Sequence, residues 1–160
     1  MKYYNYDIVF QEVPDEVSLA INITGCPNHC QGCHSPHLWK DTGAVLTEEV
    51  IDQLIKRYES LITCVCLMGG DAEPNEVVRL LKHVRTHTRL KTAWYSGKPH
   101  LPAFLQTAKK EAPALHGIFN YIKLGPYIPE FGGLKSTTTN QRIYRIAGSE
   151  WEDITLRMRK

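Results

Sequence analysis

The sequence predicts an α/β protein with a mostly parallel sheet, folded as a single domain over residues 1–160 with its core at about residues 7–146. Short apolar runs rich in strand formers alternate with amphipathic helical segments, and this alternation is typical of parallel βα units. The length of 160 residues fits one compact core. Apolar residues make up 42% of the chain and charged residues 22%, which is the balance of a globular protein rather than a disordered one.

The first predicted strand and helix flank a cysteine-rich segment. The run "VSLAINIT" at Val17–Thr24 combines apolar, small and β-branched residues and indicates a buried strand that ends at Gly25. The segment "TEEVIDQLIKRY" at Thr47–Tyr58 places its apolar residues on one stripe at helical spacing. Thr47 suits the N-cap, and the two glutamates that follow suit the first turn of a helix.

The rest of the chain repeats the strand–helix order. We expect strands at Thr63–Met68, Lys91–Ser96 and Asn120–Gly125, and helices at Pro74–His87 and, more weakly patterned, at 102–112. Beyond the loop segment "GGLKSTTTNQR", the run "IYRI" indicates a short strand, followed by a final helical turn.

Glycines close three of the predicted strands, at Gly25, Gly69 and Gly97. In parallel α/β folds the carboxyl ends of the strands meet at one rim, and ligands bind there. The cysteine-rich segment follows the first of these glycines, and Gly70 and Asp71 follow the second. The order of the elements therefore predicts that two segments far apart in the chain share one site.

Charge and hydropathy exclude several classes of partner. The net charge is +2 and the basic residues form no long run, whereas nucleic-acid binding needs a concentrated basic face. No apolar stretch approaches the roughly 18 residues of a membrane-spanning helix, and the N-terminal segment lacks the apolar region of a secretory signal. We therefore expect a cytoplasmic protein with no nucleic-acid or membrane partner, in which cysteines remain thiols rather than disulfides.

Three of the five cysteines, Cys26, Cys30 and Cys33, lie together in "GCPNHCQGCHSPHLW". Thiolates gathered in a cytoplasmic loop are typical ligands of soft metals. A structural zinc ion would take His34 or His37 as its fourth ligand, although zinc sites commonly draw two pairs of ligands from two segments. An iron–sulfur cluster with three protein ligands would instead leave one iron open to a small molecule.

The other two cysteines, Cys64 and Cys66, alternate with apolar residues in a predicted strand. Their spacing puts both side chains on one face of that strand, and free cysteines are commonly buried. We therefore expect both in the core. A passive electron carrier with four thiolate ligands would instead require one of them as the fourth ligand.

The C-x3-C-x2-C spacing matches the signature of the radical S-adenosylmethionine (SAM) superfamily. Within it, the segments "TGCPNHCQGCHSPHLW", "MGGDAEP", "AWYSGK" and "TNQR" occur in the order found in activating proteins of anaerobic ribonucleoside-triphosphate reductase. The chain resembles these proteins from about Asp7 to Arg145, and departures at His34 and at Ala72-Glu73 indicate a divergent subgroup. The resemblance implies an incomplete (β/α) barrel of the radical SAM type.

The resemblance also implies cofactors and site residues. The three loop cysteines would ligate a 4Fe-4S cluster, and SAM would bind at its open iron. Members of the superfamily hold the amino group of SAM with a Gly-Gly segment, and glycine lets the ligand approach the backbone closely. The candidates for contact with SAM are, in chain order, Gly32, His34, Gly69, Gly70, Asp71, Ser96 and Lys123.

These candidates have different implied roles. Gly32 and His34 flank the third cysteine, where the family contacts adenine; Ser96 is the candidate for the ribose and Lys123 for the SAM carboxylate. Each also has an ordinary structural alternative, such as a loop histidine or a solvated lysine. Asp71 has the alternative of capping the turn that follows it.

Two further features complete the site. Trp39 is a candidate to pack over the cysteine-rich segment and shield a cluster, or alternatively an ordinary core residue. The segment Thr139–Arg142 is a candidate for contact with the partner protein or with the SAM carboxylate.

The implied activity is that of a glycyl-radical activase. An electron from flavodoxin or ferredoxin would cleave SAM to methionine and a 5′-deoxyadenosyl radical, which would take a hydrogen atom from a glycine on the large subunit of anaerobic ribonucleoside-triphosphate reductase. The alternatives are an activase of another glycyl-radical enzyme such as pyruvate formate-lyase, an enzyme that modifies a small molecule, a zinc-stabilised binding module, and a passive electron carrier.

Overall fold

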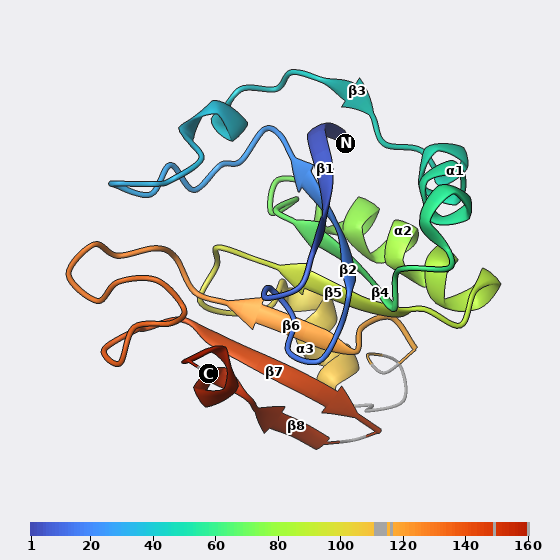
Figure 1. Ribbon diagram of the computed structural model, residues 1–160. Coiled ribbons are helices and arrows are strands. Elements are labelled where there is room, and N and C mark those ends of the chain that lie inside the picture. Colours follow the sequence, from blue (N-terminus) through green and yellow to red (C-terminus); the bar gives the residue numbers. More distant parts are fainter. Residues whose placement is uncertain (111–114, 116, 149, 160) are drawn as a thin grey trace.

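The computed structural model describes residues 1–110, 115, 117–148 and 150–159. Its strands form one mixed sheet in the order β3-β1-β2-β4-β5-β6-β7-β8 (Figure 1). The four central strands run parallel; they are β2 (Ser18–Ile23), β4 (Cys64–Met68), β5 (Lys91–Tyr95) and β6 (Tyr121–Leu124). These are the four strands that the strand–helix order predicted.

Antiparallel strands extend the parallel centre on both sides. On one side β1 (Lys2–Val9) pairs with β2 and with the short β3 (Ala44–Val45). On the other side β7 (Arg142–Ala147) pairs with β6 and with β8 (Glu150–Asp153). The sheet is therefore mixed, with its parallel strands at the centre, and closure into an incomplete barrel stays a prediction.

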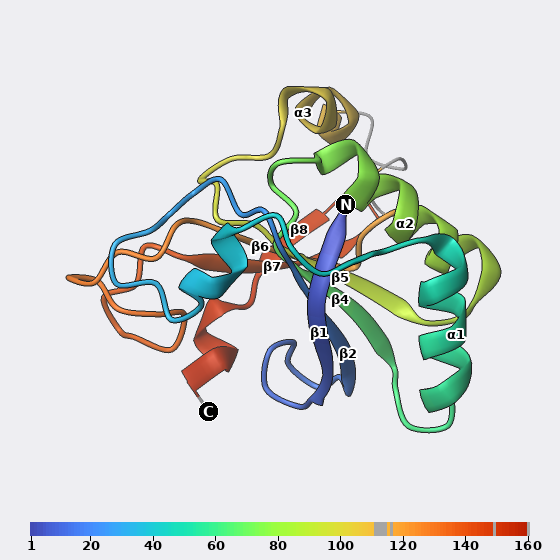
Figure 2. The ribbon, with the colours of Figure 1, turned by 90° about the horizontal axis from the view of Figure 1, so that it is seen from above.

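Three helices cover one face of this sheet, namely α1 (Glu48–Tyr58), α2 (Pro74–His87) and α3 (Ala103–Lys110) (Figure 2). The hydroxyl of Thr47 accepts a hydrogen bond from the amide of Val50 at 3.2 Å, so the predicted N-cap of α1 is confirmed. The predicted end of the third helix, at 111–112, lies outside the described residues. None of the described helices is long and apolar enough to cross a membrane.

The strands divide their side chains between two apolar clusters because successive residues point to opposite faces. The larger cluster packs strand residues such as Leu67 and Trp94 against the helices. On the opposite face, Cys64, Cys66 and Tyr121 pack with Met158 of η2 (Thr155–Arg159), the last turn of the chain. The sheet is thus covered on both faces, and its carboxyl-end rim carries the long loops.

Candidate metal centre at the carboxyl ends of the parallel strands

The cysteine loop, residues 25–40, leaves the end of β2 and returns beside its own start. The amide of Gly25 donates to the carbonyl of Lys40 at 3.1 Å, and the amide of Cys26 donates to the carbonyl of Leu38 at 3.0 Å. The short helix η1 (Pro36–Trp39) forms the returning side. These two hydrogen bonds close the base of the loop. We call the rest of the loop, residues 27–35, the arch.

The three loop cysteines are free, partly buried thiols. The amide of Ser35 donates to Sγ of Cys33 at 3.3 Å, and the amide of Cys33 donates to the carbonyl of Cys30. Nowhere in the described residues do three Cys, His, Asp or Glu side chains lie close enough to share a single metal ion. A 4Fe-4S cluster does not require this, because each of its cysteine ligands binds a different iron.

Asp71 ties the cysteine loop to the ends of β4 and β5. Its Oδ2 accepts from Nδ2 of Asn28 at 2.7 Å and from the amide of Gly97 at 2.8 Å, and its Oδ1 accepts from the hydroxyl of Ser96 at 2.5 Å. Three segments that are far apart in the sequence thus meet at one carboxylate. The prediction that the strand ends share one rim is confirmed.

The Asp71 contacts also refine the sequence-based assignment. Asp71 and Ser96 were candidates for ligand contact. In the structure the hydroxyl of Ser96 donates a hydrogen bond to the carboxylate of Asp71. Asn28 was not among the candidates, since a loop asparagine carries no spacing or periodicity that would single it out. Its role becomes visible only when the fold places Asp71 opposite the arch.

The two residues after β4 adopt conformations that require glycine. Gly69 and Gly70 have φ angles of +108° and +100°, a region that favours glycine. A Cβ on Gly70 would lie 2.5 Å from Cγ2 of Val77, so a side chain has no room there. The carbonyl of Gly69 accepts from Nε1 of Trp94 at 2.8 Å, which fixes this turn against the core.

Lys123 brings a buried cation to the same rim from β6. Its side chain donates to the carbonyl of Gly125 at 2.7 Å and to the carbonyl of Ser96 at 3.3 Å, and the residue is 8% exposed. Burial lowers its pKa to about 8, while the charges of Asp71 and Cys30 act in the opposite direction. The ammonium is therefore still mainly protonated at neutral pH.

The segment Thr139–Arg142 supports the turn that follows β6. Nδ2 of Asn140 donates to the carbonyl of Pro126 at 3.0 Å, and Nε2 of Gln141 donates to the carbonyl of Gly125 at 3.4 Å. Because Gly125 also accepts from Lys123, this segment positions the lysine indirectly.

The loop histidines pack against three different aromatic rings. His29 stacks on Trp39 with ring centroids 4.7 Å apart, whereas His34 lies against Tyr127 at 5.0 Å. His37 lies against Tyr4 of β1 at 4.9 Å. Both candidates for a fourth zinc ligand, His34 and His37, thus pack against rings outside the cysteine loop.

Gly32, the remaining candidate, lies in the arch between the second and third cysteines. Its φ is +72°, and a Cβ there would come within 3.2 Å of Cγ of Pro129 and 3.5 Å of Tyr127. The loop after β6 therefore lies against the arch, and both Figure 1 and Figure 2 show the two loops extending from the same side of the sheet.

Cys64 and Cys66 lie in the core, as predicted. Both side chains have no exposed surface, and burial raises the pKa of Cys64 to about 12 and that of Cys66 well above its ordinary value. Apolar neighbours enclose both cysteines on the face of the sheet that η2 covers, so neither suits the fourth-ligand role that a passive four-thiolate carrier requires.

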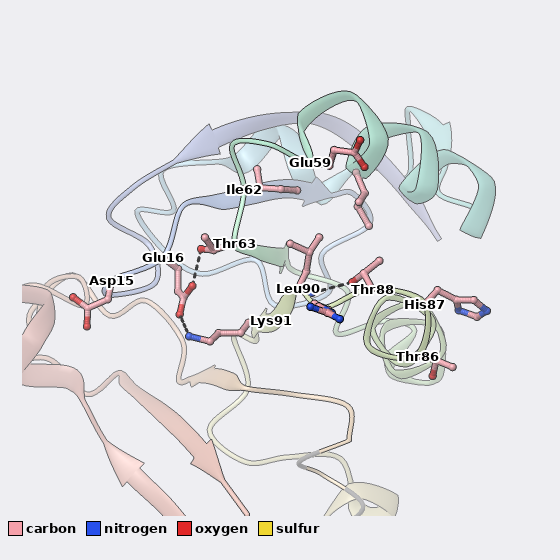
Figure 3. A pocket seen from close by; sticks show the side chains of 12 residues that line it. Asp15, Glu16, Glu59, Ile62, Thr63, Thr86, His87, Thr88, Leu90 and Lys91 are labelled. Carbon is pink, nitrogen blue, oxygen red and sulfur yellow. Dashed lines mark hydrogen bonds and ion pairs between the residues drawn. The ribbon is translucent and has the colours of Figure 1, made fainter.

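A cavity of about 1000 Å³ lies at the opposite, amino-terminal end of the parallel strands (Figure 3). Beside it, the buried carboxylate of Glu16 accepts from Lys91 at 2.5 Å, from Thr63 at 2.6 Å and from Tyr121 at 2.8 Å. These hydrogen bonds satisfy the carboxylate within the protein. Glu16 therefore joins the strand starts structurally, and the cavity is remote from the cysteine loop.

Comparison with known proteins gives one match. Residues 17–119, more than half of the chain, match the family model described as a 4Fe-4S single cluster domain. Neither a curated protein nor a solved structure matches the chain. The matched residues include the cysteine loop, Asp71 and Ser96, whereas Lys123 lies beyond them.

The cysteine loop contains the types of group that a 4Fe-4S cluster requires, namely thiol ligands and N–H donors. It supplies three free thiols in one segment, together with an amide that already donates to a cysteine sulfur. The indole nitrogen of Trp39 is buried without an acceptor. Iron–sulfur clusters take cysteine thiolates as ligands and accept N–H hydrogen bonds at sulfur, so both the ligands and an unused donor are present.

Proposed function

We propose, from the premise that the chain belongs to the family of 4Fe-4S single cluster domains, that it is a radical SAM activase. In this proposal the protein cleaves SAM reductively and generates the glycyl radical of anaerobic ribonucleoside-triphosphate reductase. Family membership establishes the iron–sulfur domain. The activity, the use of SAM and the partner are the proposal.

The meeting of the cysteine loop, the Gly69-Gly70 turn and the Lys123 ammonium at one rim supports this function most strongly. SAM carries an ammonium and a carboxylate on one carbon, so its site needs both backbone acceptors and a cation near the metal. The carbonyl of Gly69 already accepts from Trp94 and has a second lone pair for the ammonium of SAM, and Lys123 supplies the cation. Their mutual positions depend on the hydrogen bonds of Asp71.

Each side chain then has a proposed task. Cys26, Cys30 and Cys33 would hold the cluster, which when bound supplies the electron for cleavage of the C5′–S bond of SAM. Gly69 and Gly70 would let the amino group of SAM approach the backbone, and Lys123 would pair with its carboxylate. Gly32 and His34 remain the proposed contacts of adenine, and Ser96 that of the ribose.

The proposed macromolecular substrate suits the exposure of the site. The cysteine loop lies at the surface, with His29, His34 and His37 exposed, so a glycine-bearing loop of another protein has access to it. The same reasoning applies to other glycyl-radical enzymes, including pyruvate formate-lyase, and access alone does not distinguish among them.

The direct test uses protein purified and reconstituted with iron and sulfide in the absence of oxygen. After reduction with dithionite and addition of SAM, we expect 5′-deoxyadenosine and methionine as products. Cys30→Ala should abolish them, whereas the matched substitution Cys64→Ala, in the core, should leave the cluster and the products. A protein that loads the cluster but leaves SAM intact would contradict the proposal, and uptake of zinc in place of iron would favour a binding module.

A second experiment tests the partner. The reduced protein with SAM is mixed with the large subunit of anaerobic ribonucleoside-triphosphate reductase, and the glycyl radical is measured by electron paramagnetic resonance. We expect a radical on this subunit and none on pyruvate formate-lyase. The reverse result would assign the chain to the other glycyl-radical enzyme and leave the SAM chemistry intact.

A further inference from the structure

We propose that the indole N–H of Trp39 is the side-chain hydrogen-bond donor to the bound cluster and raises its reduction potential. Trp39 is the last residue of η1. Its two chain neighbours, Leu38 and Lys40, accept hydrogen bonds from the amides of Cys26 and Gly25. The backbone of Trp39 is therefore part of the base of the cysteine loop, next to the backbone of Cys26.

The indole nitrogen of Trp39 has no hydrogen-bond partner within the described chain, although the atom is buried. A buried tryptophan N–H ordinarily finds an acceptor, and leaving it without one costs free energy. Trp94 shows the ordinary case, because its Nε1 donates to the carbonyl of Gly69 at 2.8 Å. The unpaired N–H of Trp39 therefore needs an acceptor that the described residues do not provide.

The ring of Trp39 stacks on a residue of the arch. His29 stacks on it with a centroid distance of 4.7 Å and an interplanar angle of 19°. His29 lies in the arch, between the first two cysteines. The indole therefore lies against the segment that carries the cysteine ligands.

Cluster and cysteine sulfurs are the acceptors that such a site would gain. The loop already contains one N–H···S contact, from the amide of Ser35 to Sγ of Cys33 at 3.3 Å. Hydrogen bonds to the sulfurs help to set the potential of an iron–sulfur cluster. Since the reduced cluster is the more negative form, an N–H donor stabilises it more and raises the potential.

The test is a redox titration of the reconstituted protein without SAM. Trp39→Phe keeps an aromatic ring against His29 and removes the donor, so we expect a lower potential. A shift of about 59 mV corresponds to a tenfold change in the ratio of reduced to oxidised cluster for one electron, and we expect a shift of about this size. Trp151→Phe, on β8 and packed against Tyr144, is the matched control and should leave the potential unchanged. An unchanged potential in Trp39→Phe would overturn the inference.

A second measurement tests the inference on wild-type protein, and it applies if Trp39→Phe fails to fold or to hold the cluster. Wild-type protein labelled with ¹⁵N at the tryptophan indoles is reduced and examined by pulsed electron paramagnetic resonance. We expect a ¹⁵N coupling to the cluster that persists in labelled Trp151→Phe and in labelled Trp94→Phe, and its absence would overturn the inference. Neither measurement uses SAM, so the inference stands or fails separately from the proposed activity.

Discussion

The two groups of cysteines in this chain differ in setting rather than in chemistry. Cys26, Cys30 and Cys33 are partly buried on a loop, whereas Cys64 and Cys66 are fully buried in the central strand of the sheet. Burial raises the pKa of Cys64 to about 12, so its thiolate is disfavoured at neutral pH. The comparison shows that the fold determines which thiols can become metal ligands. Close spacing of cysteines in the sequence is therefore not enough to predict a metal site.

The largest expected contrast between the two groups is in their reaction with iodoacetamide. In the apo protein at neutral pH, we expect the loop cysteines to be alkylated at least about 1000-fold faster than the core cysteines, which react only through rare unfolding. Peptide mass spectrometry against time measures both groups in one sample. Loading the cluster should protect the loop cysteines alone. Equal rates in the two groups would show that the core assignment is wrong.

Substitution of Asp71 changes the support of the cysteine loop while all three cysteine ligands stay in place. Asp71→Asn keeps the shape of the side chain but removes its negative charge and replaces one acceptor oxygen with an N–H donor. This donor either opposes Asn28 and Gly97 or turns the Ser96 hydroxyl from donor to acceptor. We expect cluster affinity to fall about 10–100-fold, as for other residues that orient metal ligands, with thermal stability nearly unchanged. Iron release to a chelator measures this loss.

Asp52→Asn on α1 is the matched control for Asp71→Asn. Asp52 accepts from His83 on the neighbouring helix and lies far from the loop in the fold. We expect its iron release to match the wild type. Equal release from Asp71→Asn and the wild type would mean that the contact with Asn28 does not position the loop.

The sequence predicted the parallel centre of the fold and the location of the site for identifiable physical reasons. Strands buried on both faces, such as β4, read as continuous apolar runs, and α2 has a clear apolar stripe. β1 was not predicted, because "KYYNYDIV" is polar and aromatic and most of the strand stays half-exposed. Periodicity does not mark such a strand.

The contacts within the rim were less predictable than its location. The glycines and cysteines could be found from spacing, but the bond from Asn28 to Asp71 joins residues 43 positions apart. Likewise, the missing partner of the Trp39 indole is a property of packing around the ring. Such features depend on which residues the tertiary structure brings together, and neither residue spacing nor hydrophobic periodicity reveals this.

The pH dependence of SAM cleavage tests the proposed role of Lys123. Its ammonium is protonated below its pKa of about 8 and neutral above it, so we expect kcat/KM for SAM to fall as pH rises through about 8. The fall should approach about tenfold per pH unit above that value. Lys123→Arg should keep its charge and lose this limb. The same substitution at exposed Lys98 should leave the profile unchanged, and a flat wild-type profile would remove Lys123 from the SAM site.

The smallest expected effect comes from the other buried carboxylate, Glu16, at the amino-terminal ends of the strands. Glu16→Ala removes the acceptor of Thr63, Lys91 and Tyr121, and we expect a loss of about 1–3 kcal/mol in the free energy of unfolding. The neighbouring Asp15→Asn should cost less, about 0–1 kcal/mol, because the ion pair of Asp15 with Arg157 is exposed and asparagine tolerates the φ of +66° at this position. Urea unfolding measures both.

Cluster loading should be unchanged in each variant, since Glu16 lies at the opposite end of the parallel strands from the cysteine loop. Loss of the cluster in Glu16→Ala at a temperature where the protein is folded would show that the two ends of the sheet are coupled.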